Sequence, residues 1–460
     1  MTTAADTGAI RFPAGFDWGV ATASYQIEGA ADEDGRAPSI WDTFSHTPGR
    51  TANGETGDIA CDHYRRYRED VALMRELNAR VYRFSLAWPR LQPSGHGPLN
   101  PVGVAFYDRL IDELLGAGIR PWVTLYHWDL PQVLEDEGGW PERQTAYRFA
   151  DYAAAVHARF ADRVSDWTTL NEPWCSAFLG YAAGHHAPGR QEPAAAVRAA
   201  HHLMLAHGLA VQAMRAARDD LRYGITLNLY PTTAATASAA DREAARQVDG
   251  ICNRIFLDPI LSGRYPRDVL ADLGPIAGTG HIEDNDEKQI GQPLDLLGVN
   301  YYSRHVVRAI STDQPNAAWV GAGRAEAVRT GRPTTAAGWE IDPTGLYEIL
   351  TRVAREYAAP PLYVTENGAA FPDVIAADGA VHDPQRIEFL DGHFREAHRA
   401  IQDGVDLRGY FVWSLMDNFE WAWGYARRFG LAYVDYATQR RLIKDSGRWY
   451  SRVSAANGLG

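Results

Sequence analysis

Eight short apolar runs recur along this chain, and each is followed by a stretch with the periodicity of a helix. The runs occupy residues 18–21, 81–85, 122–126, 167–170, 223–229, 294–299, 362–365 and 407–413. Short apolar segments of this kind are typical of parallel strands that are covered on both faces. Eight strand–helix units favour closure into a barrel over an open sheet. The sequence therefore predicts an α/β fold, a single (β/α)8 TIM barrel.

The segments between the runs support helices and give no sign of a domain boundary. Apolar residues recur every three or four positions within residues 64–77 and again within 106–114, which builds one stripe on each helix. No repeat, low-complexity tract or linker divides the 460 residues. Since α/β barrels often keep such lengths in one unit, we expect a single catalytic domain over residues 1–460.

Charge and apolar content exclude several kinds of partner. The chain has 45 basic and 58 acidic residues, a net charge of -13, and an acidic surface repels phosphate backbones. It contains no apolar run of about 18 residues, so we expect no membrane span. Residues 1–16 have neither a basic start nor an apolar core of signal-peptide length. We therefore expect a cytoplasmic protein without nucleic-acid or membrane partners, and the oligomeric state stays open.

The three cysteines do not form a framework. Cys61, Cys175 and Cys252 are far apart, no CxxC pair exists, and an odd number cannot all pair within one chain. A disulfide scaffold is not expected. This agrees with a reducing compartment.

Polar and aromatic residues gather where the predicted strands end. In an α/β barrel the C-terminal strand ends converge on one mouth, so residues that follow different runs become neighbours. The set consists of residues 24–29, Arg83, residues 126–129, 171–174, 300–302, 366–368 and 413–421. No glycine-rich phosphate loop and no HExxH sequence occurs among them. His127, Asp129, Glu172 and Glu366 could be imagined as metal ligands, but their spacing matches no metal motif, and amides and indoles surround them. No metal and no organic cofactor is expected.

Two of these residues, Glu172 and Glu366, suit the cleavage of a glycosidic bond. One carboxylic acid must protonate the leaving oxygen, and a second carboxylate must attack or stabilise the anomeric carbon. Each glutamate alone has a simpler interpretation. Glu366 could be an ion-pair partner of Arg83, and residues 171–173 could be a helix start capped by Asn171. Both glutamates together with the surrounding amides and aromatic rings favour catalysis.

Several motifs resemble those of glycoside hydrolase family one, the β-glucosidase family. They include FDWGVATASYQIEG at residues 16–29, TLNEP at 169–173, YVTENG at 363–368 and WSLMDNFEW at 413–421. The resemblance runs from FPAGF at residues 12–16 to DSGRWY at 445–450. Their order and spacing also fit that family.

The resemblance implies a retaining mechanism with two catalytic glutamates. Glu172 is the implied acid/base and Glu366 the implied nucleophile, supported by Arg83 and Tyr302. These two supports should lower the pKa of Glu366, while the charge of Glu366 should raise that of Glu172. Attack by Glu366 removes that charge, so Glu172 should then lose its proton and act as base toward water.

The resemblance also assigns the sugar site. The residues expected to hold the hydroxyls of the terminal sugar are Gln26, His127, Asn171, Glu420 and Trp421. Asn171 should contact the 2-hydroxyl, and Trp413 should lie under the ring. Tyr302, Trp128 and Phe429 complete this subsite. On the aglycone side Trp339 should form a wall, together with Trp174, Cys175, Leu179 and His186, although Trp339 could equally be a packing residue.

The expected activity is that of an exo-acting β-glucosidase on cellobiose or aryl glucosides, as in cellulose degradation. β-Galactosidase or β-fucosidase activity at the same site stays an alternative, because these sugars differ by single hydroxyls. A 6-phospho-β-glucosidase is disfavoured because Glu420 would repel the phosphate, although Arg427 and Arg428 are near. Glu172 argues against a thioglucosidase, and both glutamates argue against a sugar-binding protein without catalysis. A closed pocket would disfavour an endo-acting glycanase.

Overall fold

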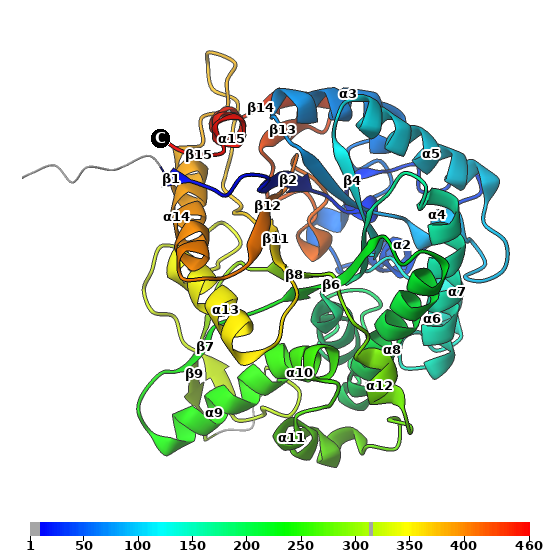
Figure 1. The fold of residues 1–460 in the computed structure, drawn as a ribbon, viewed down its shortest axis with the longest axis vertical. Coiled ribbons are helices and arrows are strands. Elements are labelled where there is room, and N and C mark those ends of the chain that lie inside the picture. The colour runs from blue at the N-terminus through cyan, green and yellow to red at the C-terminus, as the bar shows by residue number, and fades with distance from the viewer. Residues whose placement is uncertain (1–9, 312–315) are drawn as a thin grey trace, which may run out of the picture.

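The computed structural model describes residues 10–311 and 316–460 and contains a closed barrel of eight parallel strands (Figure 1). In chain order the barrel strands are β2 (Asp17–Ala21), β3 (Val81–Ser85), β4 (Arg120–Tyr126), β5 (Asp166–Asn171), β6 (Arg222–Asn228), β8 (Leu296–Asn300), β11 (Leu362–Asn367) and β12 (Leu407–Trp413). Each strand coincides with one apolar run of the sequence, and β12 pairs with β2 to close the ring. The predicted (β/α)8 barrel is confirmed. Residues 1–9, part of the segment expected to lack a signal peptide, lie outside the described residues.

Helices connect the strands and surround the barrel in Figure 1. The principal ones are α3 (His63–Glu76), α5 (Pro101–Gly116), α7 (Arg143–Phe160), α8 (Pro193–Ala217), α9 (Ala239–Asp249), α10 (Ile255–Ser262), α11 (Arg267–Ala277), α13 (Pro343–Glu356), α14 (Pro384–Gln402) and α15 (Asp445–Ala456). Shorter ones are α1 (Ser24–Ile27), α2 (Ile40–His46), α4 (Trp88–Leu91), α6 (Gln132–Asp136), α12 (Asp286–Ile290), the π-helical turns η2 (Cys175–Ala182) and η3 (Gly250–Arg254), and the 3₁₀ turns η1 (Ala52–Gly54) and η4 (Trp421–Trp423). No helix in the described part of the chain is both long and apolar enough to span a bilayer.

Within the described residues, three small sheets lie outside the barrel. Near the chain ends β1 (Ile10–Arg11) pairs with β15 (Gly458–Leu459), and β13 (Ala432–Asp435) pairs with β14 (Arg440–Ile443). The third contains β7 (Thr232–Ala234), β9 (His305–Ala309) and β10 (Ala325–Ala327). The third sheet follows barrel strands β6 and β8, and two of its residues, His305 and Ala327, line the cavity described below.

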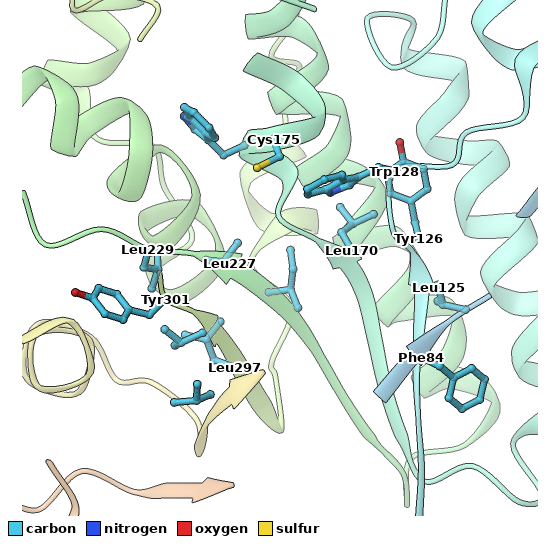
Figure 2. Packing of buried hydrophobic residues seen from close by; sticks show 14 of the residues in the cluster. Phe84, Leu125, Tyr126, Trp128, Leu170, Cys175, Leu227, Leu229, Leu297 and Tyr301 are labelled. Carbon is cyan, nitrogen blue, oxygen red and sulfur yellow. The ribbon is translucent and has the colours of Figure 1, made fainter. Parts of the chain in front are cut away.

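The predicted helical stripes form part of the main apolar core. Tyr67, Val71 and Met74 of α3 are buried, as are Phe106 and Leu110 of α5. Figure 2 shows strand side chains of the same core, among them those labelled Leu125, Leu170, Leu227 and Leu297. The apolar stripes of the helices and the apolar side chains of the strands thus pack together and are buried in one core.

The barrel interior is filled by a second, smaller cluster. The Trp122 ring lies 4.9 Å from Tyr363 and 5.1 Å from Phe411, measured between ring centroids. Gly19 leaves room for this packing, because a Cβ there would lie 2.4 Å from the Phe411 ring. The barrel is therefore a packed core that supports the polar residues at its C-terminal end.

Candidate active site

Glu366 lies near the C-terminal end of β11, where two donors hold its carboxylate. Arg83 of β3 donates a hydrogen bond from Nη1 to Oε1 at 2.6 Å, and the Tyr302 hydroxyl donates to Oε2 at 2.8 Å. Both contacts implied by the resemblance are present. Burial nevertheless raises the pKa of Glu366 above its usual value, while the charge of Arg83 and the two hydrogen bonds counteract that rise. The net direction is opposite to the expected lowering, because the loss of solvation outweighs the two donors.

Glu172 follows β5 directly and has uncharged partners. Asn300 Nδ2 donates to Oε1 at 2.7 Å, and the Cys175 thiol donates to Oε2 at 3.1 Å. The backbone at Glu172 is left-handed, with φ of 48°, and its N–H donates to the Thr226 carbonyl of β6 at 3.0 Å. Burial, and secondly the charge of Glu366, raise the pKa of Glu172 to about 7. This carboxyl is thus suited to carry a proton near neutral pH.

Asn300, at the end of β8, joins the surroundings of the two carboxyls. Its Nδ2 donates to Glu172 and also to Asn171 Oδ1 at 3.1 Å, and its Oδ1 accepts from the Thr365 hydroxyl at 2.8 Å. Arg83 Nη2 donates to the same Asn171 oxygen at 2.7 Å. Asn300 had no predicted role. Its position at the end of the sixth apolar run was the available signal.

Two buried polar atoms of the predicted sugar site lack a hydrogen-bond partner among the described residues. They are Gln26 Oε1, an acceptor, and His127 Nδ1. Asn171 Nδ2 lies 3.0 Å from His127 Nε2, so that nitrogen accepts and Nδ1 carries the proton. Burial holds the pKa of His127 well below its usual value, which keeps the ring neutral. Sugar hydroxyls can both donate and accept hydrogen bonds, so they can pair with this unpaired acceptor and this unpaired donor.

Glu420 is a third buried carboxyl, on the segment after β12. Its Oε2 accepts from Gln26 Nε2 at 3.4 Å. Burial and then the charge of Glu366 raise its pKa to about 8. Arg428, considered as a phosphate ligand, instead donates to Asp417 Oδ2 at 2.7 Å. Neither Arg427 nor Arg428 is among the residues that line the cavity.

Aromatic rings cluster beside these polar groups. The Trp421 ring lies 4.6 Å from that of Trp128 and 4.5 Å from that of Trp41. His127 stacks on Trp413 at 5.7 Å. Trp41, which had no predicted role, thus packs against Trp421. Flat apolar faces of this kind pack against the C–H faces of sugars.

A cavity of about 840 Å³ connects these groups to the surface. Of the predicted site residues, its wall contains His127, Trp128, Glu172, Trp174, Cys175, Leu179, His186, Tyr302, Trp339, Glu366, Trp413, Glu420, Trp421 and Phe429. Gln26, Arg83 and Asn171 are fully buried and lie behind this wall. Trp339 packs 5.1 Å from Tyr302, so it contacts a supporting residue and lines the cavity at the same time.

The polar side chains of this site are arranged for hydrogen bonding. No group of three or more histidine, cysteine, aspartate or glutamate side chains in residues 10–311 and 316–460 is arranged to hold a metal ion. Asp129, one of the four possible ligands named above, accepts from Ser24 Oγ at 2.6 Å and is not part of the cavity wall. The three cysteines are buried thiols.

Comparison with known proteins agrees with this geometry. The chain matches the glycosyl hydrolase family 1 profile over residues 9–459. It is 54% identical over 454 residues to the thermostable beta-glucosidase B of Thermobispora bispora, covering 98% of this chain and 92% of the relative. It is 50% identical over 462 residues to a bifunctional beta-D-glucosidase/beta-D-fucosidase of Bifidobacterium breve, covering 96% and 98%.

A comparison with solved structures also finds similarity to a β-glucosidase. The psychrophilic beta-glucosidase of Micrococcus antarcticus superposes with a TM-score of 0.94 at 50% identity, covering 97% of this chain and 98% of that one. The profile match spans nearly the whole chain, and the relatives share about half of its residues. The chain belongs to glycosyl hydrolase family 1.

Proposed function

We propose that this chain is a retaining, exo-acting β-glucosidase that removes terminal non-reducing β-D-glucosyl residues from substrates such as cellobiose or aryl glucosides. One observation carries the proposal. Two buried carboxyls share one cavity, but Glu366 accepts from Arg83 and Tyr302, whereas Glu172 accepts only from uncharged groups. A nucleophile and an acid/base need this difference in surroundings.

In the first step a Glu366 oxygen attacks the anomeric carbon and the bond to the aglycone oxygen breaks. Glu172 donates its proton to that oxygen, which leaves as an alcohol. The intermediate is a glycosyl ester of Glu366, whose negative charge is gone. Because that charge helped to raise the pKa of Glu172, the acid/base now holds its proton less strongly.

In the second step Glu172 accepts a proton from water, whose oxygen attacks the anomeric carbon. The ester bond breaks and Glu366 returns to its ionised form. Two inversions at the same carbon give overall retention of configuration. The steps use only the two carboxyls and water, and an alcohol or sugar in place of water would give transglycosylation.

The remaining groups fit a single terminal sugar. Gln26 Oε1, behind the cavity wall, and His127 Nδ1 have no hydrogen-bond partner among the described residues and are assigned to sugar hydroxyls, and Trp413, Trp421 and Trp128 line the cavity with apolar faces. The relatives named above are β-glucosidases, and one also has β-fucosidase in its name. Glucosides are therefore proposed as preferred substrates, with fucosides as the second candidate.

The wider setting is also part of the proposal. We place the enzyme in the cytoplasm, acting on products of cellulose degradation as one catalytic domain over residues 1–460. The support is the set of three buried, unpaired thiols, which fits a reducing compartment.

The test is a panel of p-nitrophenyl β-glycosides with the released sugar followed by proton NMR. We expect the largest kcat/KM for the β-glucoside, a smaller one for the β-fucoside, and β-glucose as the first product before mutarotation. Release of α-glucose first would show inversion and reject the mechanism. Turnover of the fucoside or galactoside above that of the glucoside would reject the substrate assignment alone.

A further inference from the structure

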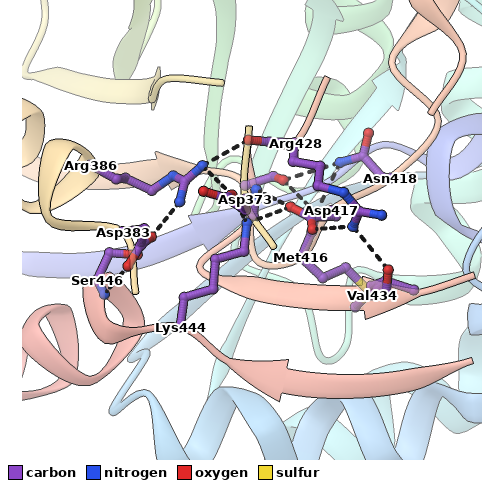
Figure 3. Close-up of polar contacts among 12 residues, drawn as sticks. Asp373, Asp383, Arg386, Met416, Asp417, Asn418, Arg428, Val434, Lys444 and Ser446 are labelled. Atoms are coloured by element: carbon purple, nitrogen blue, oxygen red, sulfur yellow. Dashed lines mark hydrogen bonds and ion pairs between the residues drawn. The ribbon is translucent and has the colours of Figure 1, made fainter. Parts of the chain in front are cut away.

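Behind the cavity wall lies a compact group of ions, five of them buried and the sixth, Arg428, partly exposed, shown in Figure 3. It comprises three carboxylates and three cations, and we call it the Lys444 cluster: Asp373, Asp383, Arg386, Asp417, Arg428 and Lys444. None of the six lines the cavity. Their charges balance, so each ion depends on its neighbours for compensation.

Lys444 bridges two carboxylates at the centre of the cluster. Its Nζ donates to Asp373 Oδ2 at 2.6 Å and to Asp417 Oδ1 at 2.7 Å. The Lys444 side chain is fully buried. Burial and then the charge of Arg386 lower the pKa of Lys444, while the two aspartates raise it. An ammonium in this position holds the two carboxylates together by charge and by hydrogen bonds.

The two aspartates belong to the segments that carry the catalytic and the sugar-binding residues. Asp373 follows β11, seven positions after Glu366, and Asp417 follows β12, three positions before Glu420. Lys444 comes from the chain between β14 and α15. The Lys444 bridge therefore connects the two segments through side chains that are distant in sequence.

A second set of bonds joins the same two segments. Arg386 of α14 donates from Nη2 to Asp373 Oδ2 at 2.7 Å and to the Arg428 carbonyl at 2.8 Å. The backbone N–H of Phe371 donates to that carbonyl at 3.3 Å. Asp417 Oδ1 also accepts from the N–H of Gly430, next to the cavity residue Phe429.

From Asp417 the contacts reach the sugar site. Asn418, the next residue, accepts from Gln26 Nε2 through its Oδ1 at 3.0 Å, and the Phe419 carbonyl accepts from the same nitrogen at 2.9 Å. These bonds leave Gln26 Oε1 as the free acceptor. A shift of Asp417 would thus move both Gln26 and Glu420 relative to the bound sugar.

We infer that Lys444 is a positioning residue for the proposed glycosidase reaction, because it fixes the segment carrying Glu420 against the segment carrying Glu366. The inference rests on the proposed function. The Lys444 cluster thereby positions Glu420, Gln26 and Trp421, the residues proposed to bind the corresponding sugar hydroxyls. The side-chain hydrogen bonds of Asn171 on β5 go to Arg83, His127 and Asn300, and none among the described residues goes to the cluster, so we expect recognition of the 2-hydroxyl to be independent of it.

The experiment combines Lys444→Met with a series of deoxy substrates. Methionine keeps much of the side-chain volume and removes the bridge. We expect kcat/KM for p-nitrophenyl β-glucoside to fall roughly 10–100-fold, as misplacement of binding groups commonly does. For at least one of the 3-, 4- and 6-deoxy glucosides, the loss of kcat/KM caused by Lys444→Met should be about tenfold smaller than for the parent glucoside. It should keep its full size for the 2-deoxy glucoside.

Two further variants separate positioning from stability. Lys444→Met combined with Asp373→Asn keeps the charges balanced and leaves Arg386 paired with Asp383 and Arg428 with Asp417. The double variant still lacks the bridge. It should therefore show the same loss of kcat/KM, with the same dependence on the sugar hydroxyls, even where the single variant folds poorly. The control is Arg143→Met, which removes a cation from Asp286, a buried carboxylate whose partners do not line the cavity. It should lower the melting temperature and leave all deoxy ratios unchanged.

The outcomes are distinct. Equal losses for all deoxy substrates, or a balanced double variant with wild-type kcat/KM, would overturn the positioning role. Altered deoxy ratios in Arg143→Met would also overturn it, because they would then follow from lost stability. Failure of the unaltered protein to hydrolyse any β-glucoside would instead reject the proposed function.

Discussion

At the residue scale, the difference between Glu172 and Glu366 comes from their donors. Both carboxyls are buried, and burial raises both pKa values. Only Glu366 has a guanidinium at 2.6 Å, which compensates its charge, whereas Glu172 has an amide and a thiol. We predict that a crystal structure with substrate will place the two carboxyls about 5 Å apart, the spacing of retaining enzymes. A separation near 8 Å would indicate inversion.

Azide should distinguish the two glutamates. Glu366→Gly should abolish turnover, because no nucleophile remains, and azide should attack from the vacated face to give an α-glycosyl azide. Glu172→Gly should still form the intermediate from a dinitrophenyl glucoside, whose leaving group needs no proton, and azide should then give the β-glycosyl azide. The second variant should lose roughly 10²–10⁴-fold where proton transfer matters. Proton NMR of the azides is the measurement, and the same anomer from both variants would show that the roles are wrong.

The pH profile should respond to Tyr302. Glu366 must be ionised in the free enzyme, so its pKa sets the acidic limb of the kcat/KM profile. Glu172 must be protonated, so its pKa of about 7 contributes to the basic limb. Tyr302→Phe removes a hydrogen bond that stabilises the carboxylate, which raises the pKa of Glu366. The acidic limb should therefore move to higher pH by about one to two units, since such a bond contributes about 1.5–3 kcal/mol.

Tyr301 offers a matched control for that variant. Its buried hydroxyl donates to the Asp342 carbonyl at 2.6 Å and does not touch either glutamate. Tyr301→Phe should leave the acidic limb where it is. An unchanged limb in Tyr302→Phe would contradict the assigned role of that hydroxyl.

Glu420 should exclude phosphorylated sugars. Because the pKa of Glu420 is raised to about 8, a 6-phosphate would meet a third carboxylate above that pH, and below it the phosphate would lose solvation beside the protonated group; neither Arg427 nor Arg428 lines the wall to compensate its charge. We expect kcat/KM for p-nitrophenyl 6-phospho-β-glucoside to be at least about 100-fold below that of the free glucoside. Steady-state kinetics with both substrates would test this, and a preference for the phosphorylated one would reverse it.

At the scale of the element, the barrel strands depend on glycines that make room for their neighbours. A Cβ at Gly298 of β8 would lie 2.4 Å from Thr226 Oγ1 and 2.7 Å from Thr365 Oγ1. Thr365 precedes Glu366, and Asn300 follows two positions after Gly298. The packing of these three strands therefore sets the positions of Glu366 and Asn300.

Gly298→Ala should accordingly reduce both stability and activity. Overpacking of a core site costs roughly 1–3 kcal/mol, and displacement of β11 should lower kcat as well. Gly116→Ala, at the end of α5 with nothing within 4 Å of the new Cβ, should leave the free energy of unfolding unchanged or raise it by up to about 1 kcal/mol. Denaturant titration and steady-state kinetics on both variants provide the measurement, and a Gly298→Ala protein with unaltered kcat would refute the packing argument.

At the scale of the whole molecule, the shape of the cavity determines where a chain of sugars is cut. Gln26 and His127 of the predicted sugar site are buried, and Trp41 packs against Trp421 beside them, so we expect the cavity to end at the terminal sugar. The enzyme should therefore act from the non-reducing end. With cellotriose labelled at its reducing end, the first products should be unlabelled glucose and labelled cellobiose. Chromatography of early time points would reveal endo-action if labelled glucose appeared first.

Much of this organisation follows from local sequence patterns. Eight apolar runs specified eight strands, because short covered strands require continuous apolar residues, and the stripes of residues 64–77 and 106–114 specified helices. The residues next to the strand ends then had to meet at one mouth, since parallel strands in a barrel all end on the same side. For that reason Glu172, Glu366 and their aromatic neighbours could be placed together from sequence.

Other features depend on residues that are distant in sequence. Asn300 contacts Glu172 across 128 positions, and Lys444 reaches Asp373 across 71, so no local pattern marks either pair. The raised pKa of Glu366 has the same origin. Its two donors were predictable from the motifs, but the extent of its burial depends on the packing of the whole barrel. Sequence by itself determined the elements and brought Glu172 and Glu366 to one mouth, because both follow from local periodicity and short motifs. Only the tertiary structure decided the solvation and charge balance around that pair, because both are sums over side chains from every part of the chain.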